Sequence, residues 1–291
     1  MATKLTLIHG DCTEVLPTLE RESVDLIFTD PPFNAGFSFA NDNIPEAQFW
    51  LLMAKWLTEA LAVLKPDGQM YVKFSTVKTW KLTLLAEKLG YKYENTIIWD
   101  KQIYPKRYGY RNWTYSYEPI LVFSKGNGIR LNKPTPNILR VKPCYYKRNE
   151  YNKRDFIVQT PLEVPHSIIS AATKTGATVL DCFLGSGTTL LACKMLERNG
   201  IGIELEAQTV ELAKRRLEWG MNPIQYEFVN ASQITQSAGN TQSAPSIQSV
   251  ANVQDIPNIE NIHSTQESAR TAKKTRTKED AYWIRRSLEI A

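Results

Sequence analysis

The sequence predicts an α/β fold with a mostly parallel sheet, and two observations support this prediction. Short apolar runs such as residues 24–28 are rich in β-branched and aromatic side chains and end in polar residues, as buried parallel strands do. Longer segments with apolar residues at helical spacing lie between these runs, so that strands and helices alternate along the chain. The 291 residues are enough for one large domain with appended segments.

The composition is that of an ordinary globular protein, with 43% hydrophobic and 22% charged residues. No apolar run reaches the roughly 18 residues that span a bilayer, and the first strand follows the start of the chain without a leader. We therefore expect a cytoplasmic protein with no membrane partner. The cysteines form no CxxC pair and the histidines lack ligand spacing, so neither a disulfide framework nor a metal site is expected.

Periodicity places the elements of the sheet and the helices that cover it. Strands are expected over 5–9, 24–28, 70–74, 95–99, 119–123, 177–181 and 200–204. Helices are expected over 46–64, 77–89, 190–197 and 206–219, the first of them stopping at a Lys-Pro-Asp-Gly signal. The strands over 95–99 and 119–123 are expected to pair antiparallel at a sheet edge.

The stretch Thr29-Asp30-Pro31-Pro32-Phe33-Asn34 follows a predicted strand at its carboxyl end, where open α/β sheets bind ligands. Two prolines offer no N–H, which leaves the carbonyls of Asp30 and Pro31 free to accept hydrogen bonds. An amino group on a flat heterocycle suits this set, because it donates two hydrogens while its ring stacks on Phe33. The alternative is a Pro-Pro turn that only ends a strand.

A second candidate site is the glycine-containing turn over 182–189, which lies between a predicted strand and a predicted helix. The next strand ends in Glu204, about 20 positions after the turn, where a carboxylate meets ribose hydroxyls in nucleotide-binding folds. Neither a P-loop nor a GxGxxG pattern is present. The combination of strand, turn, helix, strand and acid predicts a cofactor site.

Basic residues gather in two segments of the middle of the chain. Residues 101–113 interleave basic and aromatic side chains, and residues 125–154 carry nine basic residues against one acid. This imbalance favours a nucleic-acid surface over a solvated loop with a charge bias. Further on, residues 223–269 are rich in Gln, Ser and Asn and predict a flexible linker, and residues 270–291 predict a basic helix.

With these motifs in view, the chain resembles the β group of DNA amino-methyltransferases over nearly all of residues 5–219. Both the Asp-Pro-Pro-Phe motif at 30–33 and the Asp-x-Phe-x-Gly-Ser-Gly-Thr-Thr turn at 181–189 match it, in the order typical of the group. The resemblance implies a circularly permuted, Rossmann-like S-adenosylmethionine methyltransferase fold with helices on both faces. Residues 1–124 would form the catalytic half, 125–160 the target-recognition segment and 161–222 the cofactor-binding half.

The resemblance also assigns roles to individual residues. The catalytic motif would be Asp30, Pro31, Pro32 and Phe33. The residues expected to hold S-adenosylmethionine are Asp11, Cys12, Asp30, Asp181, Phe183, Gly185, Ser186, Gly187, Thr188 and Glu204. The residues expected to contact DNA are Asn34, Lys106, Arg107, Arg111, Lys142, Tyr145, Tyr146, Lys147 and Arg148.

The implied activity is methylation of the N6 amino group of a flipped adenine in double-stranded DNA. Asp at the first motif position with Asn after the aromatic residue usually accompanies adenine in this family. The alternatives are N4-cytosine methylation and a catalytically idle DNA-binding module of the same fold. The resemblance also implies nucleoid association and leaves open a homodimer and a cognate restriction endonuclease as partners. Two departures are Cys182, where the family has Pro, and a missing lysine before Pro165.

Overall fold

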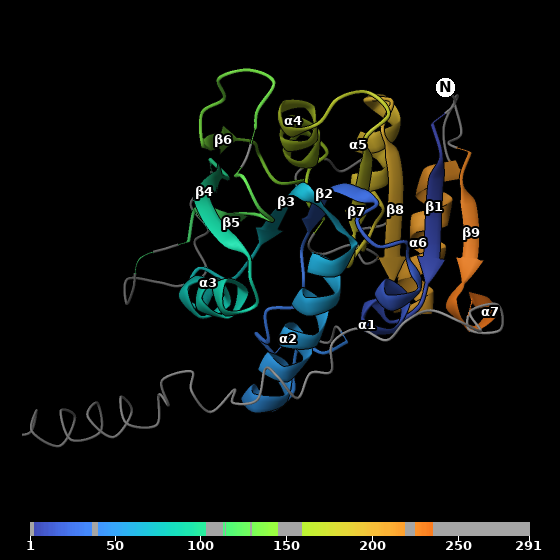
Figure 1. Ribbon diagram of the computed structural model, residues 1–291, viewed down its shortest axis with the longest axis horizontal. Helices are drawn as coiled ribbons and strands as arrows, with labels where there is room; N and C mark the ends of the chain where they lie inside the picture. Colours follow the sequence, from blue (N-terminus) through green and yellow to red (C-terminus); the bar gives the residue numbers. More distant parts are fainter. Residues whose placement is uncertain are drawn as a thin grey trace, which may run out of the picture. The chain divides into compact units, whose positions relative to one another are not determined.

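The computed structural model describes residues 3–36, 40–102, 113, 115–128, 130–144, 159–218 and 225–234. Within this part of the chain, nine strands form one sheet in the order β6-β4-β5-β3-β2-β7-β8-β1-β9 (Figure 1). The strands are β1 (Leu5–His9), β2 (Val24–Thr29), β3 (Leu64–Lys73), β4 (Lys92–Asp100), β5 (Tyr117–Ser124), β6 (Ile138–Arg140), β7 (Thr178–Asp181), β8 (Asn199–Glu204) and β9 (Glu227–Asn230). The helices are α1 (Cys12–Val15), η1 (Leu16–Thr18), α2 (Glu46–Val63), α3 (Thr79–Lys88), α4 (Glu163–Ala172), α5 (Thr188–Met195), α6 (Ala207–Glu218) and α7 (Ala231–Ile234).

The course of the chain through the sheet reverses between β2 and β7. From β2 the chain continues to β3 on one side, whereas from β7 it continues to β8 on the other side. Strands β2 and β7 pair with each other in parallel, so their carboxyl ends meet at the same edge of the sheet. Open α/β sheets bind their ligands at such a switch point.

Helices cover both faces of the sheet, as the sequence predicts (Figure 1). Helices α1, α2 and α3 form one hydrophobic core with the sheet, and α4, α5 and α6 form the other. Because side chains alternate along a strand, Ile27 of β2 faces the first core while Leu26 and Phe28 face the second. None of the described helices is both long and apolar enough to cross a membrane.

The predicted antiparallel pair is confirmed, since β4 and β5 pair antiparallel and β5 is also antiparallel to β3. The pair does not form the sheet edge, however, because β6 pairs in parallel with the outer side of β4. This strand has only three residues and lies in the basic segment, so no run of apolar residues signals it. Residues 138–140 of the predicted target-recognition segment are therefore part of the sheet.

Two further elements differ from the prediction. Helix α4 was not predicted; it buries Val164, Ile168 and Ile169, with Pro165 in its first turn, where a missing N–H breaks no helical hydrogen bond. Strand β3 begins at Leu64, so the Lys-Pro-Asp-Gly signal ends α2 but leads directly into a strand.

The prediction of a linker that begins at residue 223 is wrong at its start. Residues 227–230 form β9, which pairs in parallel with β1, and α7 follows directly. The pairing gives the backbone N–H and C=O groups on the outer side of β1 their hydrogen-bond partners. The Gln- and Ser-rich composition of the following residues gives no sign of this strand. The rest of the linker and the predicted basic helix over 270–291 lie outside the described residues.

Candidate active site

The two predicted motifs meet at the switch point of the sheet. Asp30 follows β2 directly, and Asp181 is the last residue of β7. The hydroxyl of Thr29 donates a 2.9 Å hydrogen bond to Oδ1 of Asp181, which joins strand ends that are 152 residues apart in the chain. The fold thus places the Asp-Pro-Pro-Phe motif beside the glycine turn.

Asp30 is held by a lysine that the sequence reading missed. Nζ of Lys73, the last residue of β3, lies 2.7 Å from Oδ2 of Asp30 and 2.9 Å from Oε2 of Glu118. The other carboxylate oxygen of Glu118 pairs with Lys101. Burial raises the pKa of Asp30 to about 6, although the charge of Lys73 opposes the rise. Four alternating charges therefore line the floor of the site.

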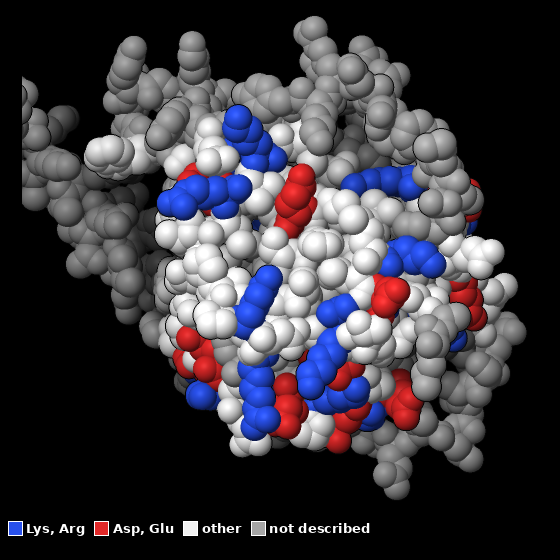
Figure 2. All heavy atoms as spheres, turned by 90° about the horizontal axis from the view of Figure 1, so that it is seen from above, with Lys and Arg blue, Asp and Glu red and all other residues white. Residues whose placement is uncertain are grey.

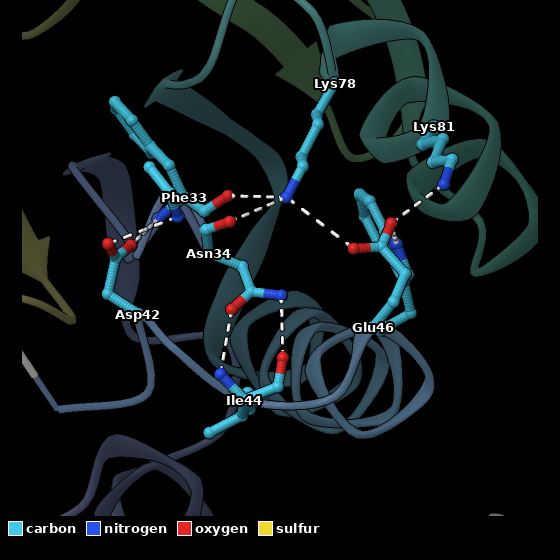
Figure 3. Close-up of polar contacts among 9 residues, drawn as sticks. Phe33, Asn34, Asp42, Ile44, Glu46, Lys78 and Lys81 are labelled. Carbon is cyan, nitrogen blue, oxygen red and sulfur yellow. Dashed lines mark hydrogen bonds and ion pairs between the residues drawn. The ribbon is translucent and has the colours of Figure 1, made fainter. Parts of the chain in front are cut away.

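Residues after the prolines form a tight loop that Asp42 organises. The buried carboxylate of Asp42 accepts hydrogen bonds from the backbone N–H groups of Phe33 (2.7 Å) and Ala35 (3.2 Å), as Figure 3 shows. The Phe33 ring packs edge-on against Phe74 at 5.5 Å and remains half-buried. Nζ of Lys78 donates to the carbonyl of Phe33 at 3.0 Å. Asp42 and Lys78 thus hold the backbone of Phe33, and Phe74 packs against its ring.

The side chain of Asn34, which is predicted to contact DNA, forms hydrogen bonds within the protein. Its side-chain amide donates to the carbonyl of Ile44 (2.9 Å) and accepts from the N–H of Ile44 (3.0 Å), which closes the loop (Figure 3). Its φ of 50° lies in the left-handed region, where asparagine is one of the few tolerated L residues. Each polar group of the side chain makes one hydrogen bond within the loop, and the DNA contact of Asn34 stays a prediction.

Replacing Asn34 with alanine is expected to lower the free energy of unfolding by about 1–3 kcal/mol, because two hydrogen bonds to the backbone are lost and the left-handed conformation becomes costly. Urea denaturation measures the change. Asn127→Ala is the matched control, because that side chain makes one exposed hydrogen bond, to Asp67 at 3.2 Å. Equal urea midpoints for the two variants would contradict the assigned role.

The carboxylate of Asp181 accepts hydrogen bonds from residues of the glycine turn. Oδ2 accepts a 2.6 Å hydrogen bond from the hydroxyl of Thr189, and Oδ1 accepts one from the N–H of Phe183 at 3.1 Å. Burial raises the pKa of Asp181 to about 7, against the effect of these hydrogen bonds. The Phe183 ring packs on Trp56 at 5.3 Å. Asp181 and Phe183, which are both predicted to bind the cofactor, thus stabilise the turn through contacts within the protein.

Glu204 is joined to the turn by its carboxylate. Oε2 accepts a 2.8 Å hydrogen bond from the N–H of Gly185, and Oε1 accepts one from the N–H of Glu206 at 2.9 Å. Gly185 has a φ of +53°, and a Cβ on it would meet nothing within 4 Å. The turn is therefore open at Gly185, where a ligand could approach the backbone closely. An acid at the end of the next strand lies beside that opening, which fits the predicted nucleoside-binding arrangement.

The loop after the catalytic motif is hydrogen-bonded to the segment that follows Glu204. The N–H of Ala40 donates a 2.8 Å hydrogen bond to Oε1 of Glu206, two residues beyond Glu204. This hydrogen bond ties the loop to the segment that follows β8.

Ser186 and Thr188 face the protein interior. Nη1 of Arg216, on α6, donates to the hydroxyls of Ser186 (2.8 Å) and Thr188 (2.6 Å), and both residues are buried. A Cβ on Gly187 would lie 3.6 Å from Ala213 of the same helix. Of the predicted cofactor residues, these three pack the turn against α6, so any cofactor contact from them would come from the backbone.

Asp11 and Cys12 lie at the end of β1, next to β8. Oδ1 of Asp11 accepts hydrogen bonds from the N–H and hydroxyl of Thr13, both at 2.8 Å, and so caps α1. Cys12 is buried in the first core, and burial raises the pKa of its thiol. Because the side chain of Cys12 packs inward, a contact with the cofactor would come from its backbone, and this contact stays a prediction.

Of the residues predicted to contact DNA, Lys106, Arg107, Arg111, Tyr145, Tyr146, Lys147 and Arg148 lie outside the described residues. Lys142 is described and is exposed. At the start of the basic segment, the amine of Lys125 is used internally, by the carbonyl of Leu64 (2.8 Å) and by Glu22 (3.1 Å). On the face that Figure 2 shows, basic and acidic side chains of the described residues are interspersed.

Four residues whose side chains help to form the site were not predicted from the sequence: Lys73, Asp42, Glu118 and Arg216. Lys73 left a signal, since a lysine within the apolar run Met70–Phe74 must be paired if the strand is buried. The others left none, because their partners lie on elements distant in the sequence.

A model of the DNA methylase family (N6_N4_Mtase) matches residues 24–215. The chain is 31% identical over 242 residues to the Type II methyltransferase M.HpaI of Haemophilus parainfluenzae, covering 74% of this chain and 75% of that protein. It is 31% identical over 246 residues to the DNA adenine methyltransferase YhdJ of Escherichia coli (strain K12), covering 73% and 82%. The crystal structure of the M1.HpyAVI–SAM complex superposes with a TM-score of 0.60 at 28% identity, covering 74% of this chain and 100% of that chain.

Proposed function

The chain belongs to the DNA methylase family, and on that premise we propose that it transfers a methyl group from S-adenosylmethionine to the N6 amino group of adenine in DNA. One observation supports this most strongly: the Asp30 motif and the open glycine turn lie side by side at the switch point, joined through Thr29 and Asp181. A donor held over the turn and an acceptor held by the motif would then be neighbours.

The residues present fit the cofactor. The open backbone at Gly185 and the acid Glu204 beside it would hold the nucleoside portion, and the end of β1 closes the same edge next to β8. When bound, S-adenosylmethionine supplies an electrophilic methyl group. The protein itself contributes the placement of the two reactants and the charge near the reacting nitrogen.

The target amino group would be held by the catalytic motif. Among the described residues, Oδ1 of Asp30 has no ion-pair or hydrogen-bond partner, whereas Oδ2 is taken by Lys73. Oδ1 and the carbonyl of Pro31 are therefore available to accept the two N–H hydrogens of the amino group. These bonds disfavour conjugation of the nitrogen lone pair with the ring and stabilise the positive charge that develops on nitrogen. The half-buried Phe33 offers a ring for stacking a flipped base.

Adenine is favoured over cytosine by Asp30 with Asn34 in the motif and by the printed name of the Escherichia coli relative. Mass spectrometry of nucleosides from DNA methylated by the purified protein tests the assignment. N6-methyladenine is the expected product. Recovery of N4-methylcytosine alone would replace the proposal with its same-fold alternative, and recovery of neither would remove it.

Target recognition is proposed for the segment 125–160, with Lys142 and the basic and aromatic residues near 145–148 as DNA contacts. The names of relatives that are Type II methyltransferases support a cognate restriction endonuclease as partner. DNA from cells that express the protein should then resist cleavage by that endonuclease.

A further inference from the structure

Lys73 is a buried cation at the floor of the site. Only 5% of the residue is exposed, and its amine lies between the carboxylates of Asp30 and Glu118. The rings of Trp99 and Phe33 lie 5.5 and 5.9 Å from the amine, so aromatic faces enclose it as well. A lysine is almost never buried to this extent unless it is paired.

The pairing is asymmetric in a way that bears on Asp30. Glu118 has a second cation, Lys101, whereas Lys73 is the one lysine or arginine found within ion-pair distance of Asp30 among the described residues. Removing Lys73 would leave Glu118 neutralised and the half-buried Asp30 without a counter-ion among the described residues. The effect of this lysine is therefore concentrated on the carboxylate of the catalytic motif.

Resting on the proposed function, we propose that Lys73 is a positioning residue that keeps Asp30 ionised and holds its Oδ2, so that Oδ1 is presented to the target amino group. An ionised Asp30 accepts two hydrogen bonds, one from Lys73 and one from the target, whereas a protonated one presents a donor to a group that must itself donate. Methyl transfer then depends on Lys73 without contact between this lysine and either reactant.

The charges that face Asp30 come from four neighbouring elements, and their signs set the expected pH dependence. Lys73 on β3 and Lys101 after β4 lower the pKa of Asp30, whereas burial and Glu118 on β5 raise it. Asp181 on β7 is also close enough to interact with it. Burial lowers the pKa of Lys73 itself, but the two carboxylates outweigh this effect, so the amine stays charged.

Two substitutions should therefore move the titration of Asp30 in opposite directions. Lys73→Met removes the opposing cation and should raise the midpoint by about 1–3 pH units. Glu118→Gln removes a like charge and the competing partner of Lys73, and should lower the midpoint. Lys73→Arg keeps the cation and should leave the midpoint close to that of the unmodified protein.

Lys65→Met is the matched control, because it breaks a lysine–aspartate pair of the same 2.7 Å length at the opposite end of the same two strands. Each protein is labelled with ¹³C at aspartate carboxyls, and the Asp30 resonance, assigned by its loss in Asp30→Asn, is followed from pH 4 to 9. In parallel, single-turnover methyl transfer is measured over the same range. The acid limb of the rate profile should move with the resonance in Lys73→Met and Glu118→Gln, and stay in place in Lys65→Met.

An unchanged Asp30 midpoint in Lys73→Met, or a rate reduced equally at every pH, would overturn the proposal while leaving the proposed function standing. If Lys73→Met does not fold, the other two variants decide. A lower Asp30 midpoint in Glu118→Gln together with an unchanged midpoint in Lys73→Arg supports the proposal. If the midpoint does not fall in Glu118→Gln, or if it shifts in Lys73→Arg, the proposal is overturned. If the unmodified protein transfers no methyl group, the proposed function fails, and the carboxyl titration still decides the role of Lys73.

Discussion

Asp30→Asn should reduce the single-turnover rate of methyl transfer by at least about 10²–10³-fold, the loss typical of removing one preorganised polar group that stabilises developing charge. Asparagine keeps the shape of the side chain but carries no charge, so it cannot offset the positive charge that develops on the target nitrogen. Although Asp30 is also among the residues expected near the cofactor, binding of S-adenosylmethionine, measured by calorimetry, should stay within about twofold, because Oδ2 is paired with Lys73 and Oδ1 is assigned to the target base.

Asp25→Asn is the matched control for this substitution. Asp25 lies near the start of β2, at the opposite end of this strand from the site, and pairs with Lys65 at 2.7 Å. Its replacement should leave the transfer rate close to that of the unmodified protein. Near-normal turnover of Asp30→Asn would mean that the motif does not hold the reacting amino group.

Glu204→Gln should weaken binding of S-adenosylmethionine about 10- to 100-fold. The carboxylate accepts hydrogen bonds from the backbone of Gly185 and of Glu206, at 2.8 and 2.9 Å. A glutamine amide must turn its donor toward one of these N–H groups, and a lost hydrogen bond to a charged group costs about 1.5–3 kcal/mol. The shape of the turn at the opening would change, and one acceptor for a ribose hydroxyl would be lost with it.

Calorimetric titration of cofactor into the variant measures this effect. Glu227→Gln, an exposed carboxylate on β9 that pairs with Lys4, is the control and should bind as the unmodified protein does. Identical dissociation constants for the two variants would show that Glu204 does not serve the cofactor.

The sequence predicted the parts of the fold that depend on local pattern. Strand β2, the glycine turn and helix α2 follow from periodicity and turn residues, and their positions are confirmed within a few residues. Strands β6 and β9 escaped prediction because they have three and four residues, and their strand conformation comes from pairing with β4 and β1. A pairing partner on a distant segment leaves no local pattern.

For the site too, the sequence predicted some of the residues and missed others. Residue type identified Asp30 and Glu204, but the direction of a side chain depends on what packs around it. The side chain of Asn34 is hydrogen-bonded to Ile44 and that of Cys12 is buried in the core, and the sequence does not predict either direction. Lys73 reaches Asp30 only because β3 lies beside β2, a neighbour relation that appears once the sheet is assembled.

The hydrogen bond between Thr29 and Asp181 spans 152 residues, so the two halves of the site come together only when the chain closes a very large loop. The entropy of loop closure grows with the logarithm of loop length, and doubling the length costs only about 0.6 kcal/mol. Residues inserted between β6 and α4 would therefore slow the formation of the site and scarcely reduce its stability. The fold can lengthen or replace that stretch over evolutionary time while Thr29, Asp30 and Asp181 keep the same arrangement.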